Sequence, residues 1–177
     1  MRDTFAPHAD GVRMHLRADE ASLLRSLLGE LRTLLDDRIA DDAVTQRLFP
    51  ATVTGDDDAD REVRDLVHGN VHDTKVAAAR QVQELLGSDD GRAVTAVLRD
   101  EEPVLVLGVL NDLRLALGAR VGDEHLLGTD LDAVPPRELA LMQLMSHLAA
   151  WQEELLGVLD PASLGFYDDF GFDDEDD

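Results

Sequence analysis

The chain has 177 residues, a length typical of one globular domain whose core needs no disulfide or structural metal. Its 38 acidic and 16 basic residues give a net charge of −22, which disfavours direct binding to nucleic acids and anionic membranes. The absence of cysteine excludes thiol nucleophiles, thiolate metal sites and disulfide switches. Neither a membrane-spanning apolar run nor a secretory signal is evident, so we expect a cytoplasmic protein.

Two hydrophobic periods predict the secondary structure. Alternation of apolar and polar side chains indicates strands, and the predicted strands cover residues 11–17 and 93–98. Apolar residues repeating every three or four positions indicate helices. The predicted helices cover residues 19–38, 42–48, 60–86, 101–117 and about 137–159, the last directly after Pro135-Pro136.

The two halves of the chain resemble each other at an offset of 82 residues. Leu16-Arg17 corresponds to Leu98-Arg99, and Leu31-Arg32 corresponds to Leu113-Arg114 in the helix that follows. Leucine-rich helices also match by chance, so duplication and coincidence are both open explanations. A duplication would place two strand–helix–helix units about a pseudo-twofold axis, with their strands paired antiparallel.

From these elements we predict a single, mainly helical α+β domain over residues 1–165. About four or five helices form a bundle with a small two-stranded antiparallel ribbon. Residues 166–177 are expected to form a separate, flexible acidic tail.

This tail holds seven acids, no base and four of the seven aromatic residues of the chain. The aromatic residues are Phe166, Tyr167, Phe170 and Phe172. Such rings supply contact area, while the acids keep the segment solvated and steer it toward a basic protein. The tail is therefore a candidate binding segment, with a solubilising tail that folds back onto the body as the alternative.

The most unusual stretch, Asn-Asp-Leu-Arg-Leu-Ala-Leu-Gly, begins at Asn111. Its leucines are expected on a buried face, which places Arg114 beside apolar surface. A buried arginine stays protonated, so we expect a carboxylate to pair with it. Arg32, with Glu30 nearby, is expected to match it in the first unit. Asn111, Asp112 and Arg114 are thus predicted to form a structural ion-pair motif, with a ligand site as the alternative.

Two histidines, His68 and His72, lie one helical turn apart, a separation that can chelate zinc. Gly69 occupies the position where the metalloprotease motif has its glutamate, and no third ligand is evident nearby. Gly-rich phosphate loops and nucleophile elbows are also absent from the sequence. We therefore predict no catalytic residue, no metal and no cofactor.

Four motifs are spread along the chain: Arg47-Leu48-Phe49-Pro50, Arg61-Glu62-Val63-Arg64, Leu110-Asn111-Asp112-Leu113-Arg114-Leu115-Ala116-Leu117-Gly118 and Trp151-Gln152-Glu153. In this combination the chain resembles an actinobacterial family that carries a domain of unknown function. Many members of that family are described as oxidative-stress transcriptional regulators. The resemblance implies a cytoplasmic regulator that acts through RNA polymerase or an alternative sigma factor. Redox sensing in those regulators is attributed to cysteines, so a disulfide switch does not transfer to this chain.

The charge, the tail and the resemblance together favour a non-enzymatic regulatory interaction protein. Its expected partner is a basic protein, such as a sigma factor or RNA polymerase, and it is not expected to bind DNA directly. One alternative is a homo-oligomeric structural or scaffold domain, in which leucines of the long helices build a homodimer interface. A metal-dependent enzyme using His68 and His72 is the remote alternative.

Overall fold

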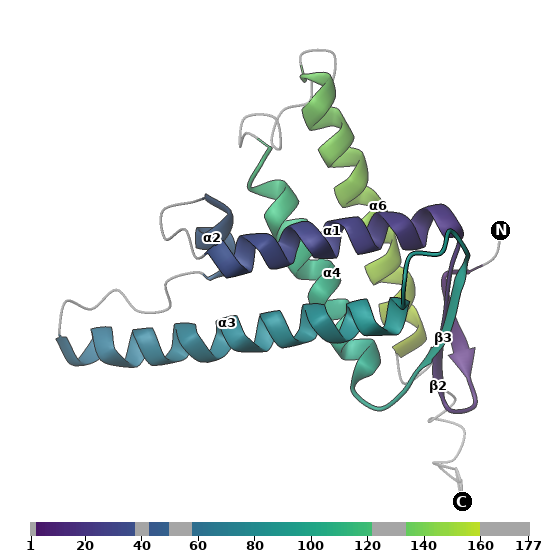
Figure 1. Ribbon diagram of the computed structural model, residues 1–177, viewed down its shortest axis with the longest axis horizontal. Coiled ribbons are helices and arrows are strands. Elements are labelled where there is room, and N and C mark those ends of the chain that lie inside the picture. The colour runs from purple at the N-terminus through teal and green to yellow at the C-terminus, as the bar shows by residue number, and fades with distance from the viewer. Residues whose placement is uncertain (1–2, 38–42, 50–57, 122–133, 160–177) are drawn as a thin grey trace, which may run out of the picture.

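The computed structural model describes residues 3–37, 43–49, 58–121 and 134–159 (Figure 1). Its elements, in chain order, are β1 (Phe5–His8), β2 (Gly11–Leu16), α1 (Ala18–Asp37), α2 (Ala43–Leu48), α3 (Asp58–Leu86), β3 (Val94–Leu98), α4 (Glu102–Gly118) and α6 (Pro136–Leu159). The predicted mainly helical α+β fold is confirmed. Within the described segments, none of the helices combines the length and apolarity needed to cross a bilayer.

The sheet has three antiparallel strands in the order β1-β2-β3, so the prediction of a two-stranded ribbon missed one strand. The missing strand is β1, which a two-residue turn joins to β2 and which places Phe5 opposite Met14. Its four residues include Pro7, and so short a segment shows no readable alternation. Proline is tolerated there because β1 is an edge strand.

The register between β2 and β3 relates the two halves by an approximate twofold axis. Met14 lies opposite Ala96, which is also the residue that the offset of 82 makes its equivalent. Flanking pairs then repeat each other across this axis: Val12 with Leu98, and Leu16 with Val94. The observed register is therefore the one that two equivalent strand–helix–helix units require.

The helices follow the same arrangement. Helix α1 packs against α3 in the first unit, and α4 packs against α6 in the second. In Figure 1, α1 and α3 run side by side, α4 and α6 cross them steeply, and the sheet lies at one end of α1 and α3. Contacts of α3 and α1 with α4 join the units, and α2 also packs on α4. One core therefore serves both halves.

Equivalent leucines form this core. Leu28 and Leu110 are 0% and 1% exposed, and Leu31 and Leu113 are both 2% exposed. Burying one leucine side chain stabilises a fold by about 1.5–3 kcal/mol. The leucine stripe predicted for the first long helix is thus the face that α1 turns toward the core.

The same contact between a glutamate side chain and a backbone amide lies at the start of α1 and α4. The Glu20 carboxylate accepts a hydrogen bond from the Arg17 amide, and the Glu102 carboxylate accepts one from the Arg99 amide, both at 2.8 Å. Glu20 reaches back to the residue before α1, as in a capping box, whereas Glu102 is the first residue of α4 and bonds an amide two residues before the N-cap Glu101. This contact therefore recurs 82 residues apart, the same offset that relates Met14 to Ala96 in the sheet.

We expect Glu20→Ala and Glu102→Ala each to lower the free energy of unfolding by about 0.5–2 kcal/mol, the usual cost of losing a helix cap. The two losses should be similar because the contacts are equivalent. Urea denaturation measures both. Asp36→Ala, at an exposed position of α1, is the matched control and should change stability by less than about 0.5 kcal/mol. A loss at only one glutamate would contradict the equivalence.

Candidate functional site

The structure places some of the predicted site residues and not others. The aromatic residues of the tail lie outside the described residues: Phe166, Tyr167, Phe170 and Phe172. The side chain of His68 is likewise outside the described part of the chain. The described candidates are His72 on α3 and the polar residues of α4.

The polar residues of α4 face different surroundings. Asn111 is exposed, Asp112 is only 6% exposed, and Arg114 is half-buried. The structure therefore divides the predicted motif into two separate contacts. Asp112 contacts α3, whereas Arg114 contacts α6.

Asp112 forms an ion pair with Lys75 of α3, with 2.5 Å between Lys75 Nζ and Asp112 Oδ1. Burial raises the pKa of Asp112 above its ordinary value, while the hydrogen bond and charge of Lys75 oppose that rise. This pair was not predicted from the sequence, because its partners are 37 positions apart. One signal was available, since Lys75 is the only lysine of the chain.

Arg114 has a neutral partner where a carboxylate was expected. Its Nη1 donates to Gln152 Oε1 at 2.5 Å, and Gln152 Nε2 donates to the Leu107 carbonyl at 3.3 Å. Arg114 keeps partial contact with solvent, which screens its charge and removes the need for a buried counter-ion. The predicted ion pair at Arg114 is therefore replaced by an arginine–glutamine contact between α4 and α6.

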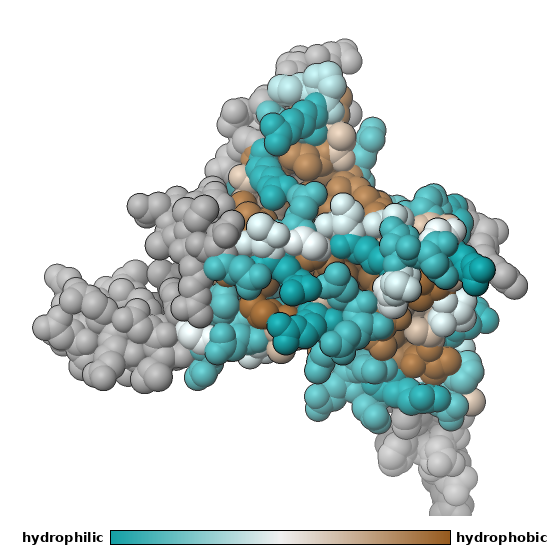
Figure 2. Space-filling model, in the orientation of Figure 1, coloured by the Kyte–Doolittle hydropathy of each residue, from teal (hydrophilic) through white to brown (hydrophobic). Residues whose placement is uncertain are grey.

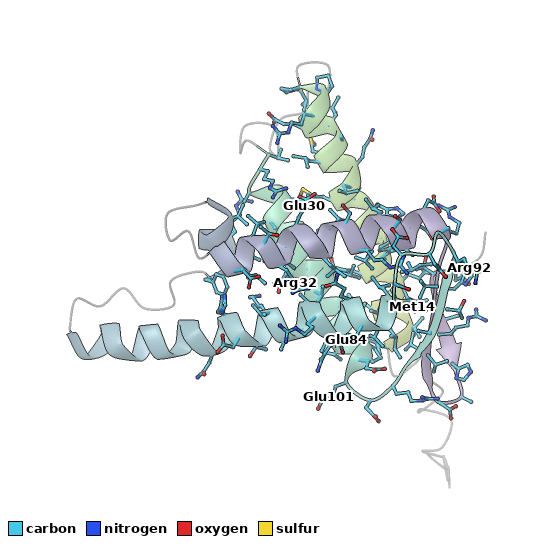
Figure 3. All side chains as sticks on the ribbon, viewed as in Figure 1. Met14, Glu30, Arg32, Glu84, Arg92 and Glu101 are labelled. Carbon is cyan, nitrogen blue, oxygen red and sulfur yellow. The ribbon has the colours of Figure 1, made fainter. Side chains whose placement is uncertain are left out.

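Arg32 makes the equivalent contact in the first unit. It lies between α1 and α3 in Figure 3, and its Nη1 donates to Gln83 Oε1 at 2.8 Å. Glu30, expected nearby as its partner, instead accepts a hydrogen bond from Arg120 at 2.9 Å. The Nε atoms of Arg32 and Arg114 are both buried without a hydrogen-bond partner within the described segments. The repeated arginine–glutamine contact is thus a structural element of each helix pair.

Beside Arg114, a shallow groove of about 460 Å³ runs between α4 and α6. Val104 and Leu156 line it and are 62% and 51% exposed, a degree of exposure unusual among the large apolar side chains that the structure describes. Arg114 and Glu153 are the charged residues of its lining. We call this feature the α4/α6 groove. Exposed apolar surface of this kind commonly marks an interaction site.

The equivalent place in the first unit is covered by a polar contact. Arg25, at the position that corresponds to Leu107, donates to the carbonyls of Leu86 and Gly87 and to the Asp89 carboxylate. Its side chain is 9% exposed. The apolar α4/α6 groove is therefore a departure from the twofold symmetry.

His72 takes part in the contact between α1 and α3. Its Nε2 lies 2.9 Å from the Leu35 carbonyl oxygen, and its Nδ1 lies 3.1 Å from Asp73 Oδ1. The described contacts thus give this ring a structural role. In the segments that the structure describes, no three histidine, aspartate or glutamate side chains come close enough to hold a metal ion.

The buried carboxyl group of Asp112 predicts a specific pH dependence. Because its pKa is raised in the folded state, it contributes stability below its unfolded pKa that is lost as the pH rises through its folded pKa. The amide of Asp112→Asn does not titrate. We expect this variant to gain stability relative to the wild type as the pH rises from about 4 to about 7.

Urea denaturation of both proteins at several pH values measures the difference. Lys75→Met is the companion variant, since it removes the group that lowers the pKa of Asp112 and should steepen the pH dependence. A difference between wild type and Asp112→Asn that stays constant with pH would contradict this prediction.

Comparison with protein families gives one match. The family model described as "Domain of unknown function (DUF2017)" matches residues 1–159 and so includes both strand–helix–helix units. Comparison with curated proteins and with solved structures finds no match. The chain belongs to the DUF2017 family, a family defined by a domain of unknown function.

Proposed function

We propose that this protein is a non-enzymatic regulatory interaction protein that binds a basic protein partner in the cytoplasm. The observation that carries the proposal is the excess of 38 acidic over 16 basic residues. Even with every base paired to one acid, 22 acids have no basic partner within the chain. Such a field attracts a basic protein at distances of about 8 Å and raises its association rate.

The described surface is consistent with this role. In Figure 2, hydrophilic side chains cover most of the face over α1 and α3, while hydrophobic side chains gather over α6. Acidic surface favours approach and orientation of a basic partner, and apolar surface stabilises the complex once it forms. Both kinds of surface lie on one small domain.

The partner class that we propose is a sigma factor or an RNA polymerase subunit. Proteins that bind nucleic acids carry basic patches, which an acidic protein can cover. The resemblance to actinobacterial stress regulators supports the same partner class. The protein then acts on transcription through its partner and without direct DNA contact. Its signal does not depend on a disulfide within the chain, because the chain has no cysteine.

Affinity capture from a native-type lysate tests the proposal. Immobilised full-length chain is expected to retain a sigma factor, a polymerase subunit or another basic protein. The amount of retained partner should be several-fold lower at about 500 mM salt than at about 50 mM salt. A chain ending at residue 165 reports the share due to the tail, and an unrelated protein of similar net charge is the matched control. Recovery of no basic partner by either chain, or equal recovery by the control, would count against the proposal.

A homo-oligomeric scaffold is the second candidate, favoured by the α4/α6 groove. The exposed Val104 and Leu156 lie together there, and the lining carries one base, Arg114, and one acid, Glu153. In a twofold dimer the same groove of each copy forms the interface. Each Arg114 can then face the Glu153 of the other copy. A second copy is therefore a complementary occupant of this groove.

Light scattering after size exclusion tests this candidate. It predicts a dimer at micromolar concentration that Val104→Asp and Leu156→Asp convert to a monomer, because each places a charge in the apolar contact. Val71→Asp is the matched control: Val71 is 38% exposed on α3, outside the groove, and its variant should leave the dimer intact. A monomeric wild-type chain removes the scaffold candidate and leaves the regulator standing.

A further inference from the structure

We propose that the outer edge of β3 is a docking site for an extended segment of a basic protein, which adds a fourth strand to the sheet. This inference rests on the proposed function, because it names the surface through which a basic partner binds. The first unit supplies an internal template. There, β1 pairs with the outer edge of β2, and the twofold relation makes that edge equivalent to the outer edge of β3.

The β3 edge presents unpaired backbone groups. In β2, the His15 amide donates to the Thr4 carbonyl at 2.7 Å, so His15 and Arg13 turn their backbone groups away from β3. Their partners in the β2–β3 ladder are Thr95 and Val97. These two residues therefore direct N–H and C=O groups outward, and no strand among the described residues pairs with them.

The edge of β3 also lacks the usual protection against pairing. Exposed edge strands commonly carry a charge or a proline that prevents another chain from adding to the sheet. β1, at the other edge of the sheet, contains Pro7. The five residues of β3, Val-Thr-Ala-Val-Leu, contain neither a charge nor a proline. This edge is therefore competent to accept another strand.

The ends of α3 and α6 bring a carboxylate beside each edge of the sheet. The Phe5 amide of β1 donates to Glu154 Oε1 of α6 at 3.2 Å. The equivalent arginine–glutamine contacts pair Gln83 with Gln152, so Glu84 corresponds to Glu153 and Leu85 holds the position of Glu154. Glu84 is exposed, and its carboxylate has no hydrogen-bond partner in the described segments. Glu84 lines the same hollow as Val97 of β3, so its carboxylate is available to a basic side chain of a docked strand.

The pairing of β1 with β2 also predicts one apolar side chain of the docked segment. Phe5 lies opposite Met14 and is 2% exposed, and the equivalent of Met14 is Ala96. Ala96 is only half-buried, whereas Met14 is 1% exposed, as expected if a covering side chain is missing from the β3 side. The docked segment therefore carries an apolar residue, best an aromatic one, opposite Ala96.

The acidic side chains beside β3 favour a docked segment that is basic. A hollow of about 890 Å³ borders this edge, and four acids and one base line it: Glu84, Asp100, Glu101, Glu102 and Arg99. Figure 3 shows Glu84 of α3 and Glu101 before α4 on the same side of the molecule. A second copy of this chain, or its own residues 166–177, would bring more negative charge to the hollow. Lysines or arginines that flank the apolar residue fit it instead.

A synthetic peptide tests the site directly. The probe is the capped octapeptide Lys-Lys-Thr-Phe-Thr-Val-Lys-Lys, added to the full-length chain, and the readout is hydrogen exchange of single amides by NMR. We expect fast exchange at Thr95 and Val97 in the free chain and at least tenfold slower exchange with saturating peptide. The same peptide with Glu in place of every Lys is the charge control and should give no protection.

Variants of the chain complete the test. Val97→Pro removes an outward amide that the ladder with β2 does not use, and it should abolish peptide binding. Glu84→Arg leaves the backbone unchanged and should weaken binding about tenfold. Asp36→Arg makes the same charge change on α1, away from this edge, and should weaken binding less than about twofold.

Each other outcome overturns the inference. Slow exchange at Thr95 and Val97 in the free monomer means that the chain's own residues cover the edge, and concentration-dependent protection means that a second copy does. No binding, binding that protects other amides, or binding unaffected by Val97→Pro and Glu84→Arg also overturns it. If the capture experiment still recovers a basic partner in those cases, the proposed function survives and only the docking surface is wrong.

Discussion

The antiparallel ladder between β2 and β3 determines the arrangement of the whole domain. Because Met14 lies opposite its own equivalent, Ala96, the ladder places the two strand–helix–helix units about one axis. Equivalent leucines of α1 and α4 then meet in a single core, and the same capping and arginine–glutamine contacts recur in each unit. A shift of one residue in this ladder would turn the inward side chains of one strand to the opposite face.

The proposed binding surfaces lie where the two units differ. β1 covers the outer edge of β2, while the equivalent edge of β3 has no strand against it among the described residues. Arg25 covers the end of α3, while its counterpart Leu107 lines the apolar α4/α6 groove. Among the described residues, these departures from symmetry leave an apolar groove and an unpaired strand edge exposed.

The spacing of apolar residues and the repeat at an offset of 82 made much of the fold predictable. The stripe on α1 and the pairing of the two predicted strands follow directly from apolar spacing and from the repeat. β1 could not be predicted, because its four residues become a strand only through pairing with β2. The side-chain partners of Arg114 and Asp112 were also out of reach, since Gln152 and Lys75 approach them only after the helices pack. Sequence thus predicts elements well and the contacts between them poorly.

Zero-length carbodiimide cross-linking of the full-length chain with its purified basic partner tests the docking account most directly. The reagent joins carboxylates to amines, and the only lysine of this chain, Lys75, is already paired with Asp112. Almost all cross-links between the two proteins must therefore join a carboxylate of this chain to a partner lysine. The account predicts that they concentrate at Glu84, Asp100 and Glu101 beside β3. Cross-links spread evenly over the acidic surface, or confined to residues 166–177, would contradict it.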